Sequence, residues 1–151
     1  MNTLAAICPD DWNFPLFLHI LGAMILVGAT LTAASALAFA RGNTQLLRLG
    51  YWTLLVVGLP SYVLMWAAAH WIYSKERLDE SPVDSAWTTI GFVVAEGGAV
   101  LFIASLIVGG VGVKRLESGR GEGLLKATMV ISLVLLAAFV VAVWAMSAKP
   151  D

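Results

Sequence analysis

Charged residues are scarce in this sequence. Only 13% of the 151 residues are Asp, Glu, Lys or Arg and 60% are hydrophobic, and the mean hydropathy is +0.86. A soluble domain carries about 25% charged residues, so this chain has too few polar side chains to cover a surface in water. The alternative solvent is lipid. The formal net charge of −1 gives no sign of a nucleic-acid partner.

The sequence also lacks the residues that several common chemistries need. Its single cysteine, Cys8, excludes an intrachain disulfide. The haem-attachment, phosphate-loop and zinc-protease motifs are absent, and two histidines with one cysteine cannot build a typical zinc site. The stretches between the long apolar runs are too short for a soluble catalytic domain. We therefore expect no hydrolase or transferase activity, and more generally a protein that is not an enzyme.

Long runs without charge occupy most of the chain. A helix needs about 20 apolar residues to cross a bilayer, and its backbone amides must be satisfied within the segment because lipid offers no partners. The sequence therefore predicts an all-α integral membrane protein, a four-helix transmembrane bundle that forms a single domain over residues 1–151. Gly58 and Pro60 predict a kink within the second span. The expected spans cover about residues 14–40, 49–73, 86–113 and 124–147.

The charges between the spans predict the orientation. The stretch 41–48 carries two basic residues and no acid, and the stretch 114–126 carries four basic residues and two acids. The stretch 75–84 has four acids and only two basic residues. Positive charge near span ends is retained in the cytoplasm. Both termini are therefore expected outside, an N-out and C-out topology.

Three titratable side chains, His19, His70 and Glu96, lie inside the predicted spans. Such residues are costly in lipid and usually face the interior of a bundle or a water-filled cavity. Counted from the outer ends of their spans, His19 lies about 6 Å and Glu96 about 13 Å deep at the rise of an α-helix, and His70 lies near the outer end of the second span. All three fall in the outer half. His19 heads a stripe of mostly small residues, which predicts a helix-packing face: Gly22, Leu26, Ala29, Ala33, Ala36 and Ala40.

Several roles are open for these side chains. Two neutral imidazoles, His19 and His70, could ligate the iron of haem b axially, with Gly22 leaving room for a porphyrin edge. A divalent metal could add Glu96 as an oxygen ligand. A quinone could accept a hydrogen bond from His19 while Glu96 exchanges a proton, and a proton relay is a fourth role. Each of the three could instead be a polar packing residue between helices.

The stretch LHILGAMILVGA, residues 18–29, resembles the first span of small bacterial membrane families with an LH-x-x-G…VG pattern. These are the copper-resistance D-like proteins, the HemJ-like protoporphyrinogen oxidases and related four-span proteins of unknown function. The pattern maps onto His19, Gly22 and Gly28. In HemJ-like members the first-span histidine is a haem ligand, so the resemblance implies that role for His19. The later HemJ-like motifs and a Met- or His-rich copper site have no match here.

Taken together, these features predict a redox-type protein of the bacterial plasma membrane. It would hold haem b or a quinone in the outer half of the bundle through His19 with His70 or Glu96. The alternative is a non-catalytic accessory or scaffold subunit of a larger respiratory-type complex, without a cofactor. Transport of protons or small solutes by an oligomer is a third. The expected partners are the lipid bilayer and other membrane subunits or further copies of the chain.

Overall fold

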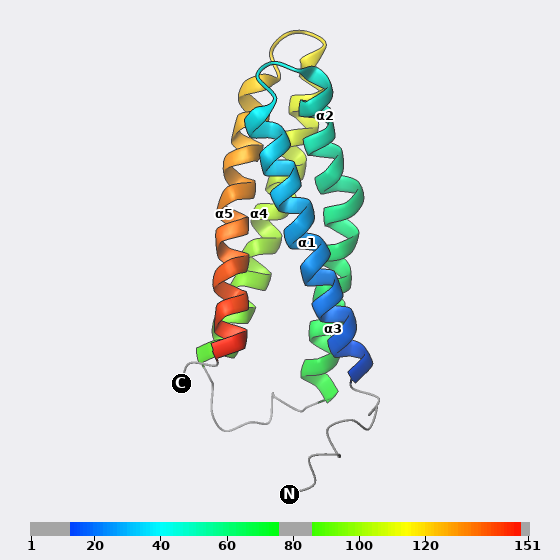
Figure 1. The fold of residues 1–151 in the computed structure, drawn as a ribbon, viewed down its shortest axis with the longest axis vertical. Helices are drawn as coiled ribbons and strands as arrows, with labels where there is room; N and C mark the ends of the chain where they lie inside the picture. The colour runs from blue at the N-terminus through cyan, green and yellow to red at the C-terminus, as the bar shows by residue number, and fades with distance from the viewer. Residues whose placement is uncertain (1–12, 76–85, 149–151) are drawn as a thin grey trace, which may run out of the picture.

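A computed structural model of the chain describes residues 13–75 and 86–148, and all regular structure within these ranges is helical. Four of its helical segments are long and apolar enough to cross a membrane. They lie side by side as a bundle (Figure 1), which confirms the predicted all-α fold. The elements are α1 (Asn13–Phe39), α2 (Thr44–Thr53), a π-helical turn (Leu54–Gly58), α3 (Leu59–Lys75), α4 (Ala86–Leu116) and α5 (Glu122–Ala148).

The second span is built from α2, the π-helical turn and α3, which together run over Thr44–Ser74. The turn ends at Gly58, two residues before Pro60, whose ring nitrogen has no hydrogen to donate to the preceding turn. At the end of the turn, the backbone N–H of Leu59 donates to the carbonyl of Leu54, five residues back. The irregularity predicted from Gly58 and Pro60 therefore takes the form of a wide turn inside a continuous span.

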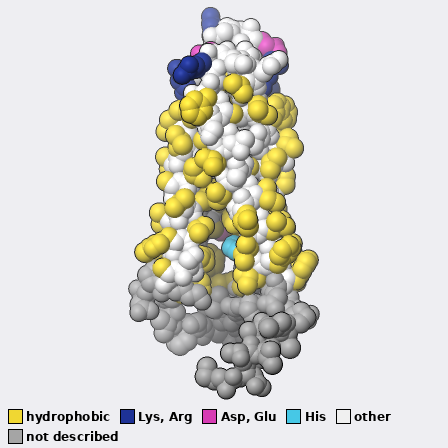
Figure 2. Space-filling model, in the orientation of Figure 1, with side chains coloured by type: hydrophobic (Ala, Val, Ile, Leu, Met, Phe, Trp, Pro, Cys, Tyr) yellow, Lys and Arg dark blue, Asp and Glu magenta, His cyan; other side chains and the backbone are white. Residues whose placement is uncertain are grey.

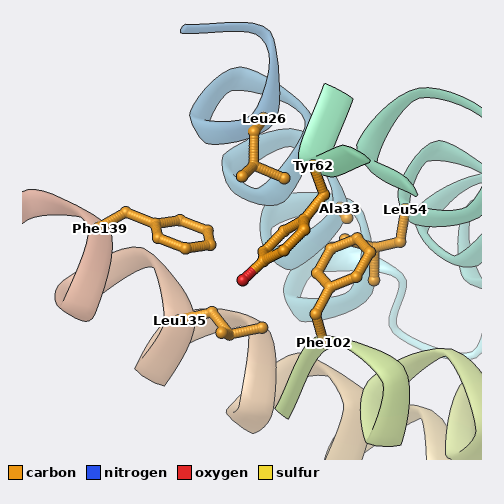
Figure 3. Close-up of a cluster of buried hydrophobic side chains, with 7 residues drawn as sticks. All are labelled: Leu26, Ala33, Leu54, Tyr62, Phe102, Leu135 and Phe139. Atoms are coloured by element: carbon orange, nitrogen blue, oxygen red, sulfur yellow. The ribbon is translucent and has the colours of Figure 1, made fainter. Parts of the chain in front are cut away.

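The main core lies in the middle of the bundle, where α1, the second span, α4 and α5 all contribute side chains (Figure 3). The Tyr62 ring stacks on Phe102 with centroids 5.3 Å apart and leans toward Phe139. Its hydroxyl donates a hydrogen bond to the Ala95 carbonyl, which joins α3 to α4. A second cluster lies nearer the end of the bundle that carries the α1–α2 and α4–α5 turns: Leu37, Ala40, Leu47 and Leu125.

Basic residues gather at this same end of the bundle (Figure 2). Two short turns close it, and each has a glycine with positive φ, Gly42 at 84° and Gly119 at 71°. Asn43 caps α2 by accepting from the N–H groups of Gln45 and Leu46. Arg48 and Glu117 form an ion pair at 3.1 Å between the two hairpins. The two stretches that the positive-inside rule assigns to the cytoplasm therefore share one end.

Toward the opposite, predicted outer end, the α1–α3 pair and the α4–α5 pair move apart (Figure 1). The space-filling view shows a hollow between the two pairs, with a histidine side chain inside it (Figure 2). Helix α1 packs closely against α3 and α5, and α4 packs closely against α5. The outer half of the bundle is therefore more open than the middle.

The small-residue stripe of α1 is a packing face, as predicted, because Gly22, Leu26, Ala29 and Ala33 are all buried. A Cβ added at Gly22 would lie only 2.8 Å from the backbone nitrogen of Met65. The backbones of α1 and α3 can approach this closely only because residue 22 has no side chain.

We expect Gly22→Ala to destabilise the bundle by about 1–3 kcal/mol, the usual cost of overpacking. The matched control is Gly28→Ala, because a Cβ there meets nothing within 4 Å. The midpoints of SDS-induced unfolding in mixed micelles measure both. Equal midpoints for the two variants would contradict this role of Gly22.

The shared basic end also gives a topology test. In a Cys8→Ser background, a membrane-impermeant maleimide should label Ser147→Cys in intact cells and should leave Ser118→Cys unlabelled until the cells are opened. Ser147 is exposed near the end of α5, and Ser118 lies in the basic α4–α5 turn. The reverse pattern would invert the topology.

Candidate functional site

His19 faces α3. Its Nδ1 lies 3.0 Å from the carbonyl oxygen of Met65, and the side chain is partly buried. A carbonyl oxygen only accepts hydrogen bonds, so Nδ1 carries the hydrogen and donates it. In the neutral ring, Nε2 then holds a lone pair. The predicted inward orientation of His19 is confirmed, and the neighbouring helix fixes its tautomer.

His70 makes the same kind of bond within its own helix. Its Nδ1 lies 3.1 Å from the carbonyl of Trp66, one turn earlier on α3. The imidazole lies over the Trp66 ring with centroids 4.0 Å apart, and the edge of Phe92 from α4 approaches at 6.4 Å. The neutral His70 ring therefore also presents its Nε2 lone pair away from its own helix backbone.

Glu96 is exposed, and one of its carboxylate oxygens accepts a hydrogen bond from the Trp66 indole nitrogen at 3.3 Å. Trp66 itself is 39% exposed. This bond joins α3 to α4 one helical turn further out than the bond from Tyr62 to Ala95. Two adjacent residues of α4 thus contact two residues of α3 that lie four apart on one helix face.

Each of the three titratable side chains therefore contacts, or belongs to, one short segment of α3, residues 65–70. His19 reaches it from α1, Glu96 reaches it from α4, and His70 belongs to it. Within residues 13–75 and 86–148, no three His, Cys, Asp or Glu side chains lie close enough together to hold a metal ion. The arrangement thus gives no support to a divalent metal held by both histidines and Glu96.

Gly22 does not leave the space that was expected for a porphyrin edge, because the Met65 backbone fills it. The helices that carry His19 and His70 are therefore in direct contact at this depth. Two histidines that bind one haem iron must reach it from opposite faces of the porphyrin. A haem with both as axial ligands requires α1 and α3 to part, whereas a haem with one of them as its ligand does not.

The sequence pointed to the titratable residues but not to the one that connects them. The Trp66 ring lies against His70 at a tilt of 39°, its backbone carbonyl accepts the hydrogen bond from His70, and its indole N–H donates to Glu96. A sequence reading assigns a tryptophan in a span to the core or the aromatic belt by default. The one feature of the sequence that indicates contact between Trp66 and His70 is their spacing, since residues four apart lie one turn apart on a helix. Its contact with α4 depends on how the helices are rotated.

The chain matches no family model, no curated protein and no solved structure.

The bond between Trp66 and Glu96 can be measured with a double-mutant cycle. We expect Trp66→Phe and Glu96→Ala to show a coupling free energy of about 0.6 kcal/mol, the average for hydrogen bonds inside membrane bundles. The midpoints of SDS-induced unfolding give the four corners of the cycle.

The matched control pairs Glu96→Ala with Trp144→Phe, because Trp144 is an exposed tryptophan on α5. This second cycle should show no coupling. Purely additive effects in both cycles would rule out a stabilising hydrogen bond at this position.

Proposed function

We propose that this chain is a redox-type membrane protein that binds a lipophilic redox molecule, a quinone or haem b, in the outer half of its bundle. The observation that carries the proposal is that His19 and Glu96 both contact the segment of α3 that holds His70, beside the hollow between the helix pairs. Polar side chains at such depth are expensive in lipid and commonly mark a functional site.

Between the two molecules, the contacts favour a quinone. Both histidines belong to the α1–α3 pair, whose backbones touch at Gly22 and Met65. A flat ring in the hollow would instead find Trp66 and the edge of Phe92 as aromatic neighbours. A bound quinone would supply two-electron chemistry. The two Nε2 atoms and the Glu96 carboxylate would accept hydrogen bonds from the hydroxyl groups of its reduced form and would take up their protons on oxidation.

Haem b would be held by the same residues through one of the two histidines. Each histidine has its Nδ1–H bonded to a backbone carbonyl, and this bond is the usual orienting contact of a metal-binding imidazole. Either Nε2 could then bind iron. A bound haem would supply one-electron chemistry, and the protein would set the ligand and the polarity around it.

The test begins with the protein purified in mild detergent. Its absorption spectrum reports haem, and solvent extraction followed by chromatography reports quinone. We expect stoichiometric quinone and no Soret band. We also expect His19→Asn and His70→Asn each to lower the affinity for quinone about tenfold, the effect of losing one strong interaction. Asparagine keeps an N–H close to the position of Nδ1 and removes Nε2.

The matched control is Glu117→Gln, since Glu117 is exposed at the basic end of the bundle. It should leave the bound quinone unchanged. A Soret band lost in one asparagine variant would instead make haem the ligand. Colourless, quinone-free protein that co-purifies with stoichiometric membrane subunits would establish the accessory role and overturn the proposal. Proton flux into proteoliposomes that is abolished by Glu96→Gln would favour transport.

A further inference from the structure

The polar groups of the site share a pattern that does not depend on which ligand binds. Each histidine already donates its Nδ1–H to a backbone carbonyl. His19 donates to Met65, and His70 donates to Trp66. Because Nδ1 holds the hydrogen in each neutral ring, Nε2 is an acceptor in each. Neither ring has a second N–H to offer.

The remaining donors of this cluster are used as well. The indole N–H of Trp66 donates to Glu96 at 3.3 Å, and the hydroxyl hydrogen of Tyr62 is bonded to the Ala95 carbonyl. As a carboxylate, Glu96 has no hydrogen to donate, and one bond from Trp66 leaves most of its acceptor capacity free. These five side chains therefore hold several free lone pairs and no free polar hydrogen.

We infer that this site selects ligands that donate hydrogen bonds, and that it therefore binds the hydroquinone, the reduced form, more tightly than the quinone. The inference rests on the proposed function and specifies its ligand. It also reverses the sequence-based expectation for His19, which had this histidine donating to a quinone carbonyl. With Nδ1–H bonded to Met65, the neutral ring accepts instead.

The physical reason is that two hydrogen-bond acceptors that face each other weaken the binding of the ligand. A phenolic O–H satisfies one of these free lone pairs, whereas a carbonyl or an ether oxygen that faces it leaves both partners without a hydrogen. Sites that bind a hydroxyl group in this way reject analogues that lack it. Tighter binding of the reduced form also raises the midpoint potential of the bound couple, by about 30 mV for each tenfold in affinity for two electrons.

The test separates hydrogen donation from redox chemistry by using two inert probes of nearly equal shape. They are para-pentylphenol and its methyl ether, para-pentylanisole. Titration calorimetry with the full-length protein in nanodiscs measures both, and empty nanodiscs give the contribution of partition into lipid. We expect the phenol to bind at least about tenfold more tightly than the ether, which corresponds to about 1.4 kcal/mol.

The variant that tests the acceptor is Glu96→Gln, which replaces an oxygen by an NH2 donor of almost the same size. It should reduce the preference for the phenol several-fold, and Glu117→Gln should leave the preference unchanged. His70→Asn, which removes the Nε2 lone pair, gives a second acceptor variant with the same expected direction.

Two results would overturn the inference. Equal affinity for both probes, or tighter binding of the ether, would mean that the site does not select donors, although a quinone found in the purified protein would leave the proposed function standing. Absence of binding by either probe would overturn it as well. A third result separates the two proposals. If the purified protein contains no quinone but still prefers the phenol, the proposed redox ligand is wrong and the selectivity for hydrogen-bond donors stands.

Discussion

The close approach of α1 to α3, at Gly22 and the Met65 backbone, controls the geometry of the outer half of this bundle. Because residue 22 has no side chain, the two backbones come near enough for the ring of His19, one turn further out, to reach the Met65 carbonyl. That contact sets the rotation of α3 about its axis. With Met65 against α1, the next residue, Trp66, is directed toward α4, where it meets Glu96. A bulkier residue 22 would separate the helices and break the hydrogen bond from His19 to the Met65 carbonyl.

The bundle is packed unevenly along its length, and the uneven packing coincides with the polar residues. Large side chains such as Tyr62, Phe102 and Phe139 fill the middle, where all four spans meet. Further out the helix pairs separate, and the contacts there are hydrogen bonds and aromatic edges such as Trp66 to Glu96 and Tyr73 to Phe92. In lipid, the loss of apolar packing costs less than it does in water, because lipid tails replace the lost contacts. An open polar region can therefore persist beside a dense core.

The hydrogen-bond partners of these side chains discriminate between ligands more sharply than the identity of the residues does. Two histidines and a glutamate are compatible with haem, a metal ion, a quinone or a proton path. The partners of Nδ1 in His19 and His70 limit what the rings can do next, since each neutral ring keeps only an acceptor. The direct contact of α1 with α3 disfavours a haem held by both histidines. Under the proposed function, a ring that carries hydroxyl groups would satisfy these acceptors without separating α1 from α3.

The sequence by itself determined the class of protein, the four spans and the burial of the small-residue stripe of α1. These features follow from local rules: hydropathy over about 20 residues, the need to satisfy backbone amides within a segment, and a repeat that places residues on one helix face. It also marked Pro60 as a point of irregularity and identified His19, His70 and Glu96 as unusual. Only the tertiary structure decided that Gly22 contacts a backbone, that Trp66 joins His70 to Glu96, and that the Nδ1–H of His19 donates to the Met65 carbonyl. Each of these depends on which helices are neighbours and on their rotation about their axes, and no local pattern encodes either.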